Sequence, residues 1–316
     1  MGFALLGAAP AHAQAVAPPE HRRDWPPLIG SDEDPATAID AAPQLERGRT
    51  PAALLDQHRR LARTLDALAP QRHGVVDAYV LTVALDSDAV FAREAREAGR
   101  VLARRYDAGS RTLTLAGATG RDPDALPHGS LATLAVALAR VAERMDPRED
   151  VLVLYLTAHG ARAGIAYHDG DQGYGLLSPA RLAAMLDGLG IRRRLVMLSA
   201  CYSGVFVPLL ASPDTVLLTA ASSERTSFGC RADNDWTFFG DALVNHALRR
   251  PQPFEGAATE ARDSISRWEI AARLPPSDPQ LSIGADAAGW LARLEARLPA
   301  TATAPVGAPA TAALDR

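Results

Sequence analysis

Residues 151–157, VLVLYLT, form a continuous run of apolar and β-branched side chains, and His159 and Gly160 follow it closely. Such a run predicts a strand of a parallel sheet that is covered on both faces. A second run, LVMLS at residues 195–199, leads directly into Ala-Cys, which ends at Cys201. Active sites of parallel α/β sheets lie beyond the carboxyl ends of the strands. We therefore expect His159 and Cys201 to lie close together at that edge.

Apolar strand patterns alternate with helical patterns on both sides of these two runs. The predicted strands are residues 75–85, 111–116, 151–157, 195–199, 215–220 and 280–283. The predicted helices are residues 88–106, 130–145, 178–189 and 238–249. The sequence HDGD at residues 168–171 predicts the turn of a hairpin. This alternation indicates an α/β fold with a mostly parallel central sheet of about six strands and helices on both faces.

The two ends of the chain differ from this central region in composition. Residues 1–15 contain a short apolar run followed by small alternating residues, which predicts a signal peptide that lacks its charged first part. Residues 16–70 form a Pro/Ala-rich extension that contains one predicted helix, at residues 50–69. Residues 71–295 form the α/β domain, and residues 296–316 have the composition of a disordered tail. We expect a periplasmic or secreted protein, with a cytoplasmic location as the alternative.

The overall composition excludes several classes of protein. The chain has 316 residues, of which 47% are hydrophobic and 22% are charged, as in ordinary globular proteins. No apolar run reaches the roughly 18 residues of a membrane span. The net charge of -4 gives no basic signature for nucleic-acid binding. All 33 basic residues are arginine, so enzymes that depend on a lysine, such as P-loop NTPases and pyridoxal enzymes, are excluded.

A histidine and a cysteine at neighbouring strand ends predict nucleophilic catalysis. A thiol is a weak nucleophile until a base removes its proton, and His159 is placed to be that base for Cys201. The backbone N–H groups of Gly160 and Cys201 would hold the developing oxyanion. The spacing of His159, His168 and Asp169 matches no zinc motif, and this chemistry requires no cofactor. A disulfide between Cys201 and Cys230 is the alternative, and it would disable the nucleophile.

The blocks YLTAHG, at residues 155–160, and SACYSG, at residues 199–204, resemble the legumain-like (C13) cysteine peptidases. That family includes legumain and the catalytic subunit of the GPI transamidase. The resemblance covers residues 74–285 and implies a bacterial member with a caspase-like three-layer sandwich. The order His then Cys is the reverse of the papain-like order, and the caspase signature around the cysteine is absent. The resemblance implies a cysteine endopeptidase that acts on peptide or protein substrates.

The same resemblance implies a pocket for the side chain that precedes the scissile bond. Arg93 matches a pocket arginine of the family, and Asp241, in the block Phe-Gly-Asp, matches a pocket aspartate. Thr226 stands where the family has a pocket serine. A pocket with both donors and acceptors suits a small polar side chain such as Asn or Asp.

Other positions depart from the family pattern. Glu94 replaces a pocket histidine, and Ser199 replaces a glutamate that lies two residues before the nucleophile in legumain. Phe91 and Ala92 stand in the region where legumain has an asparagine near its catalytic histidine. We include Glu94 and Ser199 among the expected substrate-binding residues, although asparagine specificity does not carry over.

The sequence leaves several alternatives open. The same acyl-enzyme, resolved by an amine instead of water, would make the protein a transpeptidase or transamidase. A non-catalytic peptide-binding module would keep the fold without the chemistry. Arg93 and Glu94 have a second interpretation as a solvated charged helix face, and Asp241 has one as a first-turn helix acid. The sequence does not indicate an oligomeric state.

Overall fold

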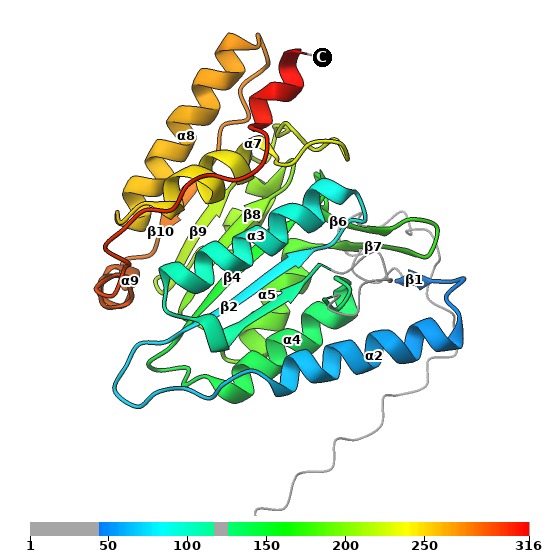
Figure 1. The fold of residues 1–316 in the computed structure, drawn as a ribbon. Coiled ribbons are helices and arrows are strands. Elements are labelled where there is room, and N and C mark those ends of the chain that lie inside the picture. The colour runs from blue at the N-terminus through cyan, green and yellow to red at the C-terminus, as the bar shows by residue number, and fades with distance from the viewer. Residues whose placement is uncertain (1–43, 117–125, 316) are drawn as a thin grey trace, which may run out of the picture.

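A six-stranded sheet forms the centre of the computed structural model, which describes residues 44–116 and 126–315 (Figure 1). The strand order is β10-β9-β8-β4-β2-β3. The strands are β2 (Ala78–Ala84), β3 (Thr112–Leu115), β4 (Val151–Thr157), β8 (Arg194–Ser199), β9 (Thr215–Thr219) and β10 (Leu281–Ile283). Strand β10 is antiparallel to β9, and the other neighbours in this sheet are parallel. The predicted mostly parallel sheet is therefore confirmed.

The two apolar runs of the sequence are adjacent central strands. Every residue of β4 and of β8 is buried, which explains why neither strand shows an alternation of polar and apolar side chains. Thr157 pairs with Ser199 at the carboxyl ends of the two strands. This register brings the segments that follow β4 and β8 to the same edge of the sheet.

Helices cover both faces of the sheet, which makes three layers (Figure 1). One apolar core contains residues of α3 (Ala89–Arg105), α7 (Phe238–Gly240), α8 (Phe254–Ala271) and α9 (Ala287–Glu295). The other core contains residues of α4 (Leu131–Arg144) and α5 (Pro179–Gly188), with Leu61 and Leu65 of α2 (Pro51–Asp66) packed against it. The predicted α/β three-layer sandwich is confirmed, whereas α8 and α9 were not predicted.

Polar residues begin the helices that the sequence predicts. Ser130 accepts a hydrogen bond from the N–H of Thr133, whose side chain in turn accepts one from the N–H of Ser130, so the two form a capping box before α4. Thr50 accepts from the N–H of Ala53, and Pro51 is the first residue of α2. These contacts satisfy N–H groups that have no partner inside the helix.

A second sheet, with the order β1-β7-β6-β5, extends from the segment after β4. Its strands are β1 (Leu45–Glu46), β5 (Gly160–Ala161), β6 (Gly164–Asp169) and β7 (Gly173–Leu177). The predicted turn at residues 168–171 connects β6 to β7 and is confirmed. Strand β1 pairs with β7, so the extension before α2 is attached to this hairpin.

The C-terminal tail, residues 296–316, was predicted to be disordered, but parts of it make specific contacts with the α/β domain. The carbonyl oxygen of Val306 accepts hydrogen bonds from Trp236 Nε1 and Asn245 Nδ2, at 2.8 and 3.1 Å. The N–H of Ala310 donates to Asp241 Oδ2 at 2.8 Å, and Ala310 is buried. Backbone groups of the tail are therefore paired with buried side chains, which a composition rich in Ala, Pro and Thr does not reveal.

Two other predictions have different outcomes. The predicted helix at residues 238–249 is divided into α7, a π-helical turn, η3 (Asp241–His246), and a 3₁₀ turn, η4 (Ala247–Arg249). The predicted signal peptide and most of the extension lie outside the described residues. None of the helices in the described ranges is long and apolar enough to cross a membrane.

Candidate active site

The nucleophile loop, residues 200–204, follows β8 and is held against the end of β9. Ser203 Oγ accepts from the N–H of Ala221 at 3.2 Å. A Cβ on Gly204 would collide with the backbone N of Ser223, so only glycine permits this close approach. Tyr202 has a φ of 56°, in the left-handed region that is uncommon for a non-glycine residue. These features fix the backbone on both sides of Cys201.

The sulfur of Cys201 lies within a set of hydrogen-bond partners from the loop after β9. The N–H of Ser227 donates to Sγ at 3.3 Å, and Ser227 Oγ lies 3.6 Å from it. The Cys230 thiol lies on the same side. Hydrogen bonding from Cys230 and Ser227, together with the charge of His159, lowers the pKa of Cys201 to about 6, although burial acts in the opposite direction. A large fraction of Cys201 is therefore the reactive thiolate at neutral pH.

Cys230 is a free thiol, and so is Cys201. The neighbouring Cys201 sulfur and burial both raise the pKa of Cys230 well above its ordinary value, so Cys230 is the protonated partner of the two. The structure therefore gives Cys230 the role of a hydrogen-bond donor to the nucleophile. It does not show the alternative disulfide.

His159 follows β4 and contacts a carboxylate that the sequence did not single out. Its Nε2 lies 3.0 Å from Asp88 Oδ2, and its ring packs edge-on against Phe91 with centroids 5.0 Å apart. Asp88 is the N-cap residue of α3, but its side chain makes no capping hydrogen bond. It is therefore available to His159. Asp88 follows β2, so the strand-end rule that found His159 and Cys201 would also have found it.

The orientation of His159 leaves its second ring nitrogen for chemistry. With Nε2–H donating to Asp88, the basic nitrogen of the neutral ring is Nδ1. Among the described residues, no hydrogen bond joins His159 directly to Cys201. The two residues interact through charge, since His159 contributes to the lowered pKa of Cys201. The ring is about half exposed, which leaves room for a substrate beside it.

The backbone of Gly160 lies directly against the backbone of Cys201. A Cβ at Gly160 would collide with the carbonyl oxygen of Cys201, so the two backbones are in direct contact. The N–H of Ala166 donates to the carbonyl oxygen of His159, which makes this a hydrogen-bonded pair of the β5–β6 ladder. Hydrogen-bonded and non-hydrogen-bonded pairs alternate along an antiparallel ladder. The next pair, Gly160 with Ile165, is therefore not hydrogen-bonded, and the N–H of Gly160 points away from β6. The arrangement is suited to holding an oxyanion.

Glu94 and Ser199 belong to a buried network beneath the site. Glu94 is completely buried and accepts from Tyr155 OH at 2.7 Å and Thr157 Oγ1 at 2.9 Å. It also accepts from the N–H and hydroxyl of Thr237 at 3.0 and 2.8 Å. Ser199 Oγ lies 3.2 Å from Thr237 Oγ1. The expectation that Glu94 and Ser199 contact the substrate is wrong, because both side chains are enclosed by the protein.

Asp241 is also enclosed. It is completely buried, and it accepts from Asn245 Nδ2 and from the N–H of Ala310, each at 2.8 Å. Its predicted place in a substrate pocket is therefore wrong, because it holds the C-terminal tail instead. The alternative interpretation of Asp241 as an acid in the first turn of a helix is confirmed, because Asp241 begins η3. The role of Asp241 in holding the tail depends on its contact with Ala310, which lies 69 residues further along the chain.

Arg93 and Thr226 are the predicted pocket residues that solvent reaches. The guanidinium of Arg93 donates to the carbonyl oxygens of Ala232 and Asn234, and its Nε lies 3.5 Å from Asp235 Oδ1. Its side chain is 38% exposed, and Thr226 is exposed. Arg93 therefore fastens the loop that follows Cys230 and still presents part of its charge to solvent.

Part of the chain is similar to a known family of peptidases. Residues 136–263 match the sequence model of the peptidase C13 family. This range contains His159 and Cys201 but begins after Asp88 and Arg93. Crystal structures matched by the fold include caspase-1 from Spodoptera frugiperda, with 12% identity and a TM-score of 0.41. That match covers 68% of this chain and 88% of the caspase chain. No curated protein sequence matches the chain.

Proposed function

We propose that this chain, which carries the peptidase C13 family sequence over residues 136–263, hydrolyses peptide bonds through Cys201 and His159. The family match confirms the resemblance to legumain-like peptidases and supports a cysteine peptidase. The environment of Cys201 is the main support for the proposal that Cys201 and His159 are the catalytic residues. Its pKa is lowered to about 6 by Cys230, Ser227 and His159, and the His159–Asp88 pair lies at the neighbouring strand end.

Each group of the site has a defined part in the reaction. The Cys201 thiolate attacks the scissile carbonyl, and the N–H groups of Gly160 and Cys201 hold the oxyanion of the tetrahedral intermediate. Protonated His159 then gives its Nδ1 proton to the departing amine, which leaves an acyl-enzyme on Cys201. A water molecule then attacks the carbonyl carbon of this thioester while His159 takes its proton. Release of the carboxylic acid restores the thiolate and the protonated imidazole.

Asp88 orients His159 for these proton transfers. A carboxylate that accepts from Nε2–H fixes the tautomer with Nδ1 as the basic nitrogen, and it stabilises the imidazolium that the first step requires. Phe91 limits rotation of the ring from its other side. Asp88 is therefore proposed as a positioning residue, since it acts through His159.

Arg93 and Thr226 are the residues we propose to contact the side chain before the scissile bond. Arg93 has five N–H donors, and two backbone carbonyls and Asp235 occupy only part of them. With Glu94, Ser199 and Asp241 enclosed, the accessible side chains offer donors and hydroxyls. This favours a small side chain with a carboxylate or amide oxygen, such as Asp or Asn.

Fluorogenic peptides that differ only in the residue before the cut test this proposal. We expect cleavage after Asp or Asn by the full chain and no cleavage by Cys201→Ala. Asp263→Asn, on the exposed side of α8, should retain cleavage and serves as the control. If no peptide is cleaved and Cys201 also resists an electrophilic peptide probe, the peptidase proposal fails, and a non-catalytic binding module becomes the better interpretation.

A further inference from the structure

Three possible metal ligands meet where β2 and β4 end. One ligand atom from each of Asp86, Asp88 and His159 lies within 4.8 Å of the other two. Within residues 44–116 and 126–315, this is the one group of three or more His, Cys, Asp or Glu side chains with such spacing. The peptidase mechanism uses Asp88 and His159, but it gives no role to Asp86.

Asp86 is an unsatisfied buried carboxylate. Its side chain is 1% exposed, and its Oδ1 accepts from the N–H of Asp88 at 2.9 Å. Its Oδ2 is buried and accepts no hydrogen bond from any described residue. A buried carboxylate oxygen that accepts no hydrogen bond is costly, and its neighbour at ion-pair distance is His168, so a bound cation would stabilise Asp86 further.

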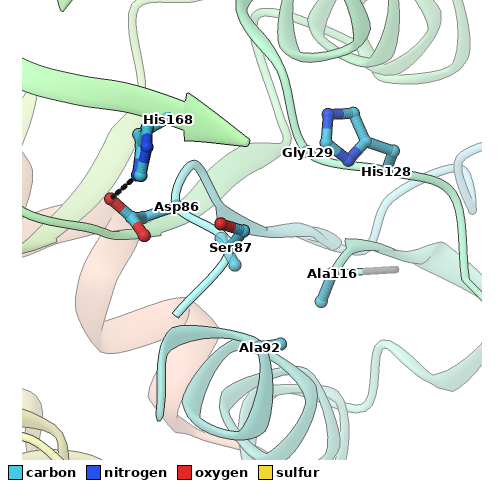
Figure 2. Close-up of a pocket in the computed structure, with 8 residues that line it drawn as sticks. Asp86, Ser87, Ala92, Ala116, His128, Gly129 and His168 are labelled. Atoms are coloured by element: carbon cyan, nitrogen blue, oxygen red, sulfur yellow. Dashed lines mark ion pairs between the residues drawn. The ribbon is translucent and has the colours of Figure 1, made fainter. Parts of the chain in front are cut away.

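His168 forms an ion pair with Asp86 (Figure 2). Its Nδ1 lies 3.6 Å from Asp86 Oδ2, which is an ion-pair distance and longer than a hydrogen bond. A small cavity of about 10 Å³ adjoins the two residues and is also lined by Ser87 and His128.

We propose that Asp86, Asp88 and His159 bind a divalent transition metal of the zinc class. Two carboxylate oxygens and one imidazole nitrogen match the ligand types that zinc takes at about 2.0–2.2 Å. An imidazole ligand makes magnesium and calcium poor candidates, because both prefer sets made entirely of oxygen. Three protein ligands leave a position for water.

The bound metal regulates the site, and this part of the inference rests on the proposed function. A metal on Nε2 of His159 replaces the proton that Asp88 accepts and adds positive charge to the ring. The imidazole then cannot become the imidazolium that protonates the departing amine. Zinc is therefore a reversible inhibitor that leaves Cys201 itself untouched.

Titration calorimetry with zinc chloride on the full-length Cys201→Ala protein tests the site. Removing the thiol excludes zinc binding by a Cys201–His159 pair. We expect one zinc ion per chain, and Asp86→Asn in this background should weaken binding at least tenfold. Asparagine at this position can still accept from the N–H of Asp88. Asp263→Asn, on the exposed side of α8, is the matched control and should bind as the parent does.

Two further measurements make the outcome decisive. Asp88→Asn in the same background should also weaken zinc binding, and cobalt chloride should give visible absorption bands that zinc displaces. Absence of stoichiometric binding, or binding equally tight in both Asp→Asn variants, overturns the proposal.

Peptide cleavage by the protein with Cys201 intact separates the site from the proposed function. Zinc should inhibit cleavage, and Asp86→Asn should retain activity in chelator while losing at least tenfold in sensitivity to zinc. If no peptide is cleaved but zinc binding depends on Asp86, the metal site stands and the peptidase proposal fails. If peptides are cleaved and zinc binding does not depend on Asp86, the metal site fails alone.

Discussion

The sulfur of Cys201 receives its hydrogen bonds from one loop, residues 220–237, which contains both Ser227 and Cys230. Cys230 is the first cause of the lowered pKa of Cys201, ahead of Ser227 and His159. The second cysteine of the chain therefore contributes to the reactivity of the first, although it is not itself positioned as a nucleophile. This gives the Cys230 side chain a testable electrostatic effect.

Cys230→Ala should raise the pKa of Cys201, because it removes a donor to the thiolate. In the unmodified protein, alkylation of Cys201 by iodoacetamide should rise through about pH 6 and level off above it, since the thiolate is the reactive form. In Cys230→Ala the rise should move to higher pH, with at least about threefold slower alkylation at pH 6. Peptide mass spectrometry would follow Cys201 alone.

Cys230→Ser keeps a hydroxyl donor and is the control for that experiment. Its alkylation profile should lie between those of the unmodified protein and Cys230→Ala. Identical profiles for all three proteins would show that Cys230 does not influence the nucleophile.

Asp88→Ala should lower kcat/KM for peptide cleavage by roughly 10–100-fold, because His159 loses the partner that fixes its tautomer and orientation. Asp88→Asn should lose less, since an amide oxygen can still accept from Nε2–H. The loss should fall mainly on kcat and leave KM nearly unchanged, because Asp88 contacts His159 and is proposed to act through it. Equal losses in Asp88→Ala and Asp88→Asn, or a loss confined to KM, would mean that Asp88 does not orient His159.

At the scale of elements, the C-terminal tail is attached to η3 through Asp241. This carboxylate accepts from the N–H of Ala310 and from Asn245 within its own helical turn. Asn245 Oδ1 in turn accepts from the N–H of Val306 at 2.8 Å. Backbone N–H groups of the tail are thus the hydrogen-bond partners of the Asp241 and Asn245 side chains. These contacts account for the order of the tail.

Asp241→Ala should destabilise the protein by about 1–3 kcal/mol, because two buried donors lose their acceptor. Thermal unfolding followed by circular dichroism should show a melting temperature several degrees lower. The exposed Asp263→Asn on α8 should change it by less than about 1 °C. Removal of residues 306–316 should produce a similar loss in the unmodified protein and a smaller further loss in Asp241→Ala. Fully additive losses would contradict the proposed anchoring contact.

At the scale of the whole molecule, the two sheets connect the extension before α2 to the active-site edge. Arg49 forms ion pairs with Glu46 and with Asp169 of β6, and Tyr167 OH donates to Glu46 at 2.7 Å. The same hairpin continues through β5 to Gly160. The segment of residues 44–50 is therefore part of the scaffold that supports the region around His159.

Arg49→Gln should release this segment, because it removes the cation between two carboxylates. Trypsin should then cleave after Arg47 several-fold faster, since cleavage requires local opening of the β1–β7 pairing. Arg59→Gln, on the exposed face of α2, should leave that rate unchanged. Equal rates of cleavage in the three proteins would show that Arg49 does not hold the segment.

Much of the fold follows from local pattern, whereas the site follows from it only in part. The buried runs of β4 and β8 predicted both the parallel sheet and the meeting of His159 with Cys201. Asp88 follows β2, so the same argument also predicts its place beside His159. The family pattern instead points to Phe91 and Ala92, where legumain has an asparagine. The burial of Glu94 and Asp241 could not be predicted, because it depends on α7 and the tail, which reach these side chains from distant parts of the chain.

Because Thr157 pairs with Ser199, the sheet itself sets the relative position of His159 and Cys201, the proposed catalytic pair. Neighbouring strands lie about 4.8 Å apart, so the backbone separation of the two segments is set by a repeat common to all sheets. Insertions in the hairpin after β5 should accordingly leave the catalytic pair aligned. A single residue inserted within β4 would instead shift the register and turn the following side chains to the opposite face. Loops around the site, such as the hairpin after β5, can therefore vary in length, provided that β4 and β8 keep theirs.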